Sequence, residues 1–147
     1  MRCGKNSIFI ELIQATRTMR RIINKYCKKY GLNLMQLSII FLAINNDMTV
    51  SSLAQALDVS KSAISQSLIK LYIKKYVTKK NIDGNKKVFY LTILPRGKEV
   101  HQDLLQMINE KEFKINEQLG NEKLATLKQL MNEYIQALKE GNEEERG

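Results

Sequence analysis

The fold is decided by one stretch of the chain, residues 49–100, which reads TVSSLAQALDVSKSAISQSLIKLYIKKYVTKKNIDGNKKVFYLTILPRGKEV. Thr49 can cap a short helix over 50–57, and Ser60 can cap a second helix over 61–75. The core-facing residues of the second helix recur at steps of three and four and are Ile64, Leu68 and Leu71. Two short helices separated by a tight turn predict a helix-turn-helix.

A β-hairpin is predicted directly after this helix-turn-helix. Its strands would be residues 76–80 and 87–94, joined by a loop over 81–85. Apolar and polar side chains alternate in the second strand along Phe89, Tyr90, Leu91, Thr92 and Ile93. Asp83-Gly84 at the tip is a strong hairpin signal, because both residues tolerate the positive φ of a tight turn. The pattern therefore predicts a wing, a hairpin that follows the helix-turn-helix.

Two helices are predicted before the helix-turn-helix. Apolar residues recur at helical spacing over 7–29, and Gly31 is placed to end that helix. Asn33 and Gln36 have the spacing of a capping box in front of a helix over 34–44. Each helix carries an apolar stripe, and that of the first is too extensive for a domain of this size to bury alone.

Two further helices are predicted after the hairpin. Pro95 suits the first turn of a helix over 95–119, because the N–H that it lacks would be unpaired there in any case. Gly120-Asn121 breaks that helix, and a last helix is expected over 122–139. The acidic end, residues 141–147, is expected to fray. The whole pattern predicts a mainly α fold.

Positive charge is concentrated in the first two thirds of the chain. The net charge is +9, but residues 1–100 hold 18 Lys and Arg against 5 Asp and Glu, whereas residues 101–147 hold 6 against 10. A basic region with a helical pattern suits a polyanionic partner, because each neutralised phosphate releases counterions. The 44% of hydrophobic residues and the single proline exclude both a disordered chain and a turn-rich all-β protein.

Several other classes of protein are disfavoured by the sequence. The start, MRCGKNSIFIELI, lacks the long apolar run of a signal peptide, and no segment approaches the roughly 20 apolar residues of a membrane span. A cytoplasmic protein without a membrane partner is therefore expected. The chain has one histidine, no Gly-rich phosphate loop and no nucleophile elbow, so neither an enzyme nor a cofactor is predicted. His101 with Asp103 is a weak ligand pair, and no metal site is predicted.

Residues 49–100 resemble the core of the MarR family of winged helix-turn-helix regulators, and the helix order extends the resemblance to nearly the whole chain. The matching positions are Leu53-Ala54, Val59-Ser60, Ile64-Ser65 and Leu68 in the helix-turn-helix, Asn85-Lys86-Lys87 at the wing, and Pro95-Arg96-Gly97 after it. Asp58 departs from the small residue common in the turn, but aspartate tolerates the left-handed conformation. Tyr76 replaces the glycine that usually ends the recognition helix, which predicts an end without a left-handed cap.

The resemblance implies a winged helix-turn-helix with N- and C-terminal dimerisation helices. The parts of this single domain, residues 1–147, would be a DNA-binding lobe at 33–95 with its helix-turn-helix at 49–75 and its wing at 76–94, and dimerisation helices at 7–30 and 95–139. The implied function is sequence-specific binding of double-stranded DNA by a homodimeric transcriptional repressor on a pseudo-palindromic operator. A small-molecule effector would bind between the dimerisation helices and the winged lobe.

Base edges would be contacted by side chains opposite the buried face of the second helix of the helix-turn-helix. The residues expected to bind DNA are Ser60, Lys61, Ser62, Ser65, Gln66, Ile69 and Lys70 on that helix, and Lys80, Lys86 and Lys87 on the wing. Gln66 is expected to pair with an adenine edge, and Ile69 to touch a thymine methyl group. Lys74, Lys75 and Lys79 add to the charge expected to meet phosphates. The resemblance implies that Lys86 or Lys87 enters a minor groove.

Two alternatives to a ligand-responsive repressor stay open. Cys27 lies beside Lys28 and Lys29, whose charge would favour a thiolate, so a redox-sensing regulator is one alternative. The plainer interpretation of Cys27 is a small packing residue. With Cys3 it matches neither a disulfide framework nor a zinc spacing. The second alternative is an architectural DNA-binding protein, which would share the basic charge but show little preference between sequences.

Overall fold

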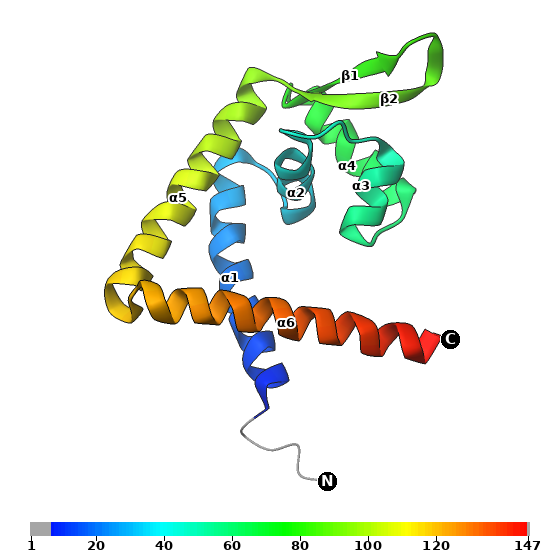
Figure 1. Ribbon diagram of the computed structural model, residues 1–147. Helices are drawn as coiled ribbons and strands as arrows, with labels where there is room; N and C mark the ends of the chain where they lie inside the picture. Colours follow the sequence, from blue (N-terminus) through cyan, green and yellow to red (C-terminus); the bar gives the residue numbers. More distant parts are fainter. Residues whose placement is uncertain (1–6, 147) are drawn as a thin grey trace. The chain divides into compact units, whose positions relative to one another are not determined.

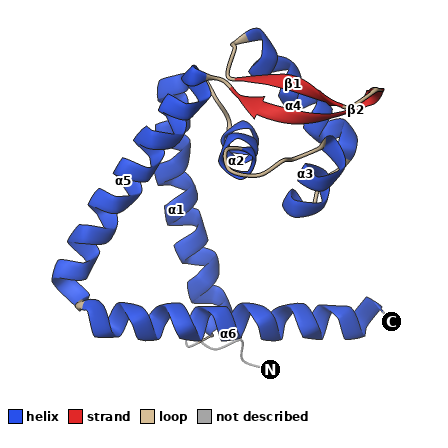
Figure 2. Cartoon of the chain, turned by 45° about the horizontal axis from the view of Figure 1, so that its top comes forward, coloured by secondary structure: helices blue, strands red, loops and turns tan. Residues whose placement is uncertain are grey.

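The computed structural model describes residues 7–146, and of residues 85–86 and 144–146 it describes the backbone only. Its elements in chain order are α1 Ile8–Tyr30, α2 Leu34–Ala43, α3 Val50–Leu57, α4 Lys61–Ile73, β1 Val77–Ile82, β2 Asn85–Ile93, α5 Pro95–Leu119 and α6 Asn121–Arg146 (Figure 1). The two strands pair as an antiparallel sheet, and the other elements are helices (Figure 2). This order confirms the predicted mainly α winged helix-turn-helix.

The chain divides into two compact units, Met1–Leu104 and Leu105–Gly147, and the boundary falls inside α5. The first unit contains a core whose side chains come from the end of α1, α2, α3, α4, the wing and the start of α5. The members of this core that are 0% exposed are Ile39, Ile40, Leu53, Ile64, Leu71, Tyr76 and Val100. Since each fully buried side chain of this size contributes roughly 1.5–3 kcal/mol, this shared core fixes the helix-turn-helix.

Local sequence signals set the starts of the three helices in the middle of the chain. The Asn33 side chain accepts the Gln36 backbone N–H at 2.9 Å, and the Gln36 side chain accepts the Asn33 backbone N–H at 3.0 Å. Thr49 and Ser52 form the same reciprocal pair in front of α3. At α4, the Ser60 hydroxyl accepts the N–H of Ala63 at 3.1 Å. Each cap pairs a backbone donor that a helix start leaves open, which confirms the predicted starts.

Helix α4 ends differently from the prediction. It stops at Ile73, two residues early, and Lys75 takes the left-handed conformation with φ +58°. The Lys75 N–H then bonds the Tyr72 carbonyl at 3.0 Å, and the Tyr76 N–H bonds the Leu71 carbonyl at 2.9 Å. This pattern is a Schellman motif, so the expected end without a left-handed cap is wrong. Burial of Tyr76 fixes the chain there and outweighs the local preference for glycine.

The wing is a tighter hairpin than predicted. Asp83-Gly84 forms the tip as expected, with Gly84 at φ +72°, but residues 81, 82 and 85 belong to the strands and not to a loop. The register shifts between Asn81 and Ile82, as in a β-bulge. The wing is also bonded to the segment before α3, because the Leu91 N–H donates to the Met48 carbonyl at 3.0 Å.

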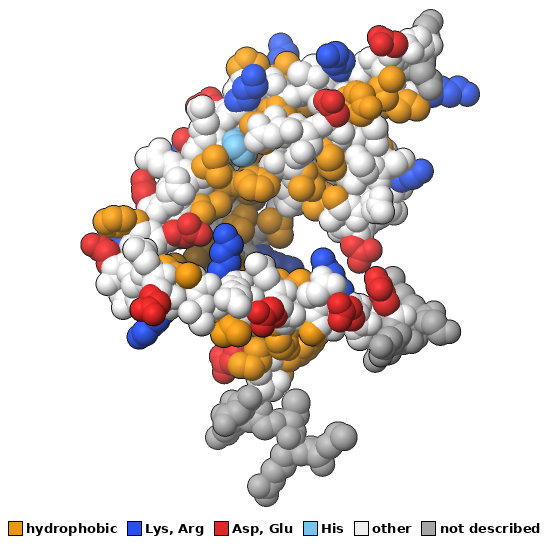
Figure 3. Space-filling view, in the orientation of Figure 1, with side chains coloured by type: hydrophobic (Ala, Val, Ile, Leu, Met, Phe, Trp, Pro, Cys, Tyr) orange, Lys and Arg blue, Asp and Glu red, His pale blue; other side chains and the backbone are white. Residues whose placement is uncertain are grey.

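The second unit consists of the end of α5 and α6, and most of its large apolar side chains are exposed. The exposed ones are Leu105, Phe113, Ile115, Leu119, Leu127, Leu130, Ile135 and Leu138. Figure 3 shows hydrophobic side chains at the surface of this unit. Helix α6 continues to Arg146, so the prediction that residues 141–147 fray is wrong as far as residue 146. The end of α6 is rich in glutamate, a good helix former. No helix within residues 7–146 is long and apolar enough to cross a bilayer.

Candidate nucleic-acid interface

Helix α4 presents one buried face and one open face. Ile64, Leu68 and Leu71 are at most 2% exposed and fix how the helix is rotated on the core. The open face consists of Lys61, Ser62, Ser65, Gln66, Ile69 and Lys70, all exposed. Ile69 is 57% exposed, so this face combines an aliphatic side chain with polar and basic ones. The rotation therefore brings the predicted base-contacting residues together on one surface.

The lysines expected to meet phosphates differ in their surroundings. Lys75, Lys80 and Lys87 are exposed, whereas the side chain of Lys86 lies outside the described residues. Lys74 is used within the protein, because its Nζ donates to the Gly31 carbonyl at 2.6 Å and so caps the end of α1. Sequence spacing could not show this contact, since the two residues are far apart in the chain.

Lys79 attaches the wing to α4. Its Nζ lies 5.1 Å from the centre of the Tyr72 ring and 4.5 Å from that of Phe89, which are cation–π distances. Burial raises the pKa of Tyr72 to about 12. Among the described residues, the buried Tyr72 hydroxyl has no hydrogen-bond partner. The ammonium group of Lys79 therefore bridges helix and hairpin, and it helps to fix the position of the wing relative to α4.

Tyr76 forms the joint between α4, the wing and α5. Its hydroxyl donates to the Tyr30 carbonyl at 2.9 Å, and the Arg96 guanidinium lies 4.7 Å from the centre of its ring. Arg96 also donates to the Lys74 carbonyl at 2.9 Å. A Cβ on Gly97 would lie 2.5 Å from the Tyr76 carbonyl oxygen, so glycine is required for this close approach. The Pro95-Arg96-Gly97 motif thus fixes the start of α5 on the wing base.

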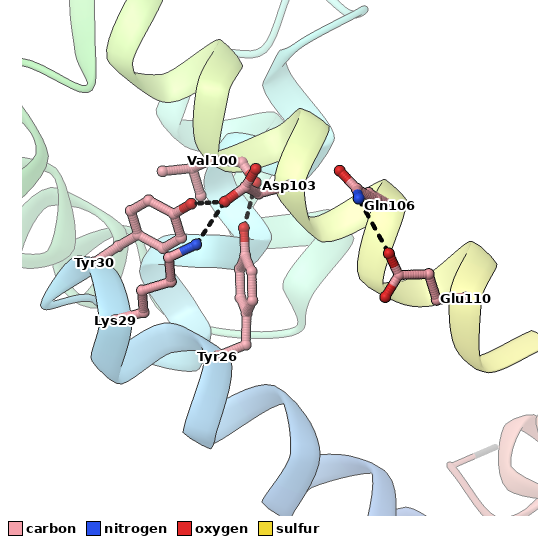
Figure 4. A network of polar contacts seen from close by, with 7 residues as sticks. All are labelled: Tyr26, Lys29, Tyr30, Val100, Asp103, Gln106 and Glu110. Atoms are coloured by element: carbon pink, nitrogen blue, oxygen red, sulfur yellow. Dashed lines mark hydrogen bonds and ion pairs between the residues drawn. The ribbon is translucent and has the colours of Figure 1, made fainter.

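A polar network joins α1 to the first part of α5 (Figure 4). The Asp103 carboxylate accepts hydrogen bonds from Lys29 Nζ at 2.8 Å and from the Tyr30 hydroxyl, and the Lys29 and Tyr30 bonds hold the pKa of that carboxyl below its usual range. The Tyr26 hydroxyl donates to the Val100 carbonyl at 2.6 Å, and burial raises the pKa of Tyr26. Farther along α5, Gln106 donates to Glu110 at 3.0 Å. The network orients α1 against α5 within the first unit.

The two residues considered as a weak metal pair have other partners. The Asp103 carboxylate is engaged by Lys29 and Tyr30, and the His101 ring lies 5.4 Å from that of Phe41, centre to centre. Among the side chains that the structure describes, no three histidine, cysteine or acidic ones gather as metal ligands. Structural contacts therefore account for both side chains.

Cys27 lies in the core and not at a reactive surface. It is 1% exposed, and burial raises the pKa of its thiol. The expectation that the neighbouring lysines favour its thiolate is wrong, because Lys28 and Lys29 point outward while the sulfur packs inward. The plainer interpretation, a small packing residue, fits this environment.

Comparisons with known proteins agree with this architecture. The family model described as the bacterial regulatory protein, arsR family, matches residues 36–79, which cover α2 to the start of the wing. A MarR protein from Peptoclostridium difficile has 18% identity and a TM-score of 0.80, over 96% of this chain and 93% of that one. No curated protein matches the sequence.

Two further solved structures were determined with ligands. FabT of Streptococcus pneumoniae in complex with DNA has 18% identity and a TM-score of 0.80, over 90% of this chain and 96% of that one. NadR in complex with 4-hydroxyphenylacetate has 22% identity and a TM-score of 0.72, over 91% and 96%. The likeness extends beyond the helix-turn-helix to the flanking helices. The chain is therefore a winged helix-turn-helix protein with the fold of the MarR-type regulators.

Proposed function

We propose that the chain is a sequence-specific regulator of transcription that binds double-stranded DNA in the cytoplasm and acts as a repressor, and that it is not an enzyme. The observation that carries the proposal is the open face of α4, where Gln66 and Ile69 lie opposite the buried stripe. An amide can pair with an adenine edge, and an aliphatic side chain can touch a thymine methyl group in the major groove. Serines and lysines around them suit bases and phosphates.

The proposed DNA contacts fall into two groups. The residues are Ser60, Lys61, Ser62, Ser65, Gln66, Ile69 and Lys70 on or before α4, and Lys80, Lys86 and Lys87 on the wing. Ser60 has a second role, because its hydroxyl caps α4. The α4 group would read bases, and the wing group would bind phosphates and a minor groove.

A homodimer on a pseudo-palindromic operator completes the proposal. One recognition helix reads few base pairs, so two-fold dimers place two such helices about one helical turn of DNA apart. Residues 7–30 and 95–139 would be the dimerisation helices of a single domain, with 33–95 as its DNA-binding lobe. The exposed apolar side chains of α6 support this division, because soluble monomers rarely expose patches of this kind.

Control by a small molecule is the last part of the proposal. NadR, which shares the fold, was solved with 4-hydroxyphenylacetate, and FabT was solved with DNA. A small effector would bind one spacing of the two recognition helices more tightly than another. It would release DNA if the favoured spacing no longer fits the operator, and its effect is limited by that difference in affinity.

The test is fluorescence anisotropy with the DNA upstream of the chain's own gene and a scrambled duplex, at near-physiological salt. A preference of about 10³-fold or more, at two chains per site, is the expected result. If no upstream sequence is preferred, a duplex selected from a random library replaces the upstream DNA in the titration. Equal binding of all sequences would favour an architectural protein, and no binding would contradict the proposal.

A further inference from the structure

The second half of α1 carries basic side chains that the proposed function does not use. Its members, which we call the α1 basic face, line a shallow groove of about 380 Å³ and are Arg17, Arg20, Arg21, Asn24, Lys25 and Lys28. They follow one another at alternating steps of three and one residues, so they share one side of the helix. All six are exposed, and this surface is as open as that of α4.

No side chain of the described chain neutralises this surface. Among the side chains that the structure describes, Lys29 pairs with Asp103, but none of the five cations of the α1 basic face forms an ion pair. Three of the six arginines of the sequence lie here, whereas residues 22–95 contain no arginine. The planar fork of arginine matches the geometry of phosphate better than lysine does. The chain thus places arginine guanidinium groups, which suit phosphate, on α1, whereas the cations of the winged lobe are all lysines.

The shape of the α1 basic face suits an extended partner. From Arg17 to Lys28 it runs for about 16 Å, at about 1.5 Å per residue. Over that length, duplex DNA presents on the order of nine phosphates on its two strands. A small anion would be held poorly, because small-molecule sites enclose most of their ligand whereas all six residues here are exposed.

Two other partners fit less well. A membrane surface requires an apolar helix face to insert, but in this part of α1 the opposite side carries Tyr26, whose hydroxyl is bonded to the Val100 carbonyl. A second copy could offer Glu122, Glu133 and Glu140 of α6. At about 100° per residue these glutamates lie opposite the apolar side of α6, so packing of apolar sides would turn both charged faces outward.

We infer that the α1 basic face binds the phosphate backbone of duplex DNA, as a second surface that does not read sequence. Helix α1 meets α4 at Gly31, where Lys74 caps it, and then runs away from α3 and α4 (Figure 1). Arg17 is about 21 Å along α1 from that junction. The α1 basic face thus lies apart from the surface of α4, and we infer that it takes a different DNA segment from the one on α4. This inference goes beyond the proposed function and does not require a preferred sequence.

The test is the capture of a second duplex. The full-length protein is saturated with the unlabelled preferred duplex, and a labelled random-sequence duplex is then titrated at several salt concentrations. We expect the parent protein to bind it. Arg17→Gln/Arg20→Gln/Arg21→Gln should lose at least about tenfold in affinity, with a salt slope shallower by about 2.7 units, roughly 0.9 for each phosphate contact. Its binding of the preferred duplex should be unchanged.

A matched control distinguishes the effect of the α1 basic face from the effect of the protein's net positive charge. Lys111→Gln/Lys114→Gln/Lys123→Gln removes the same charge from exposed positions of the second unit. It should keep most of the capture, and circular dichroism should show that both variants fold. Equal losses in both variants, no loss in either, or no capture by the parent would overturn the inference. So would binding of vesicles with anionic lipid in place of DNA.

Failure of the proposed function leaves a different signature. If no sequence is preferred, the labelled random-sequence duplex is titrated into the variant Lys61→Gln/Lys70→Gln/Lys80→Gln. This variant lacks three cations of the winged surface. DNA binding that remains there, and that disappears when Arg17, Arg20 and Arg21 are also changed, supports the α1 basic face. Remaining binding that persists after those changes contradicts it.

Discussion

Large apolar side chains form a buried core in the winged part of the first unit, whereas in the second unit most of them are exposed. Ile39, Leu53 and Ile64 are 0% exposed, because one chain supplies every surface around them. Phe113 and Leu127 of the second unit are 65% and 48% exposed, and α6 has no buried side chain among the described residues. Both regions have amphipathic helices. Periodicity therefore predicts a helix, but it does not say whether its own chain or a partner covers the apolar side.

The largest effect is expected in the self-contained core. Leu53→Ala should lower the free energy of unfolding by about 2–5 kcal/mol, because a cavity replaces fully buried atoms. Urea unfolding followed by circular dichroism measures it. Ile69→Ala, at an exposed position of the same helix-turn-helix, should change that free energy by less than about 0.5 kcal/mol. Equal effects of the two changes would remove the contrast between buried and open faces.

The next effect is expected in association of the second unit. Leu127→Lys should weaken the homodimer by more than about 2 kcal/mol, roughly thirtyfold in Kd, because it places a charge in the proposed apolar contact. Sedimentation equilibrium measures the Kd. Gln129→Lys, on the polar side of α6, is the control and should leave the Kd near its original value. A dimer that is insensitive to Leu127→Lys would place the contact elsewhere.

A smaller effect is expected on the open face of α4. Replacing thymine by uracil at the position read by Ile69 removes one methyl group and should cost about 0.8 kcal/mol, roughly fourfold in Kd. Ile69→Ala should bind both duplexes equally. Val88→Ala, an exposed apolar position on the wing, should keep the difference between the two duplexes. Anisotropy titrations supply the four Kd values. A thymine preference that survives Ile69→Ala would show that another side chain reads the methyl group.

The smallest effect is expected from Asp103 at the α1–α5 joint. Its pKa lies below the ordinary value of 3.8 in the folded chain, so its contribution is complete above that pH. The contribution is lost as the pH falls from 3.8 through the folded pKa, because the unfolded state then binds more protons. Asp103→Asn should remove this part of the pH dependence, measured as urea midpoints between pH 5 and the acid transition. An unchanged pH profile would leave the Lys29 pair without a role in stability, as is common for surface ion pairs.

Local sequence determined the elements of this protein and most of their ends. The capping residues Asn33, Thr49 and Ser60 bind backbone donors only three positions away, so the sequence alone identifies them. Asp83-Gly84 fixed the hairpin tip, and helical spacing fixed which side of α4 faces the core. The open face, with Gln66 and Ile69, follows from that same spacing. These features rest on interactions within one or two turns of chain.

Tertiary structure decided the contacts between residues distant in sequence. Lys74 reaches Gly31, Asp103 binds Lys29 and Tyr30, and Lys79 lies over two rings, none of which periodicity can show. The left-handed Lys75 belongs to the same class, because burial of Tyr76 imposes a conformation that the local sequence disfavours. Cys27 is inward for the same reason. A charge or a thiol is present in the sequence, but only the packed chain decides whether it faces a neighbour, the core or solvent.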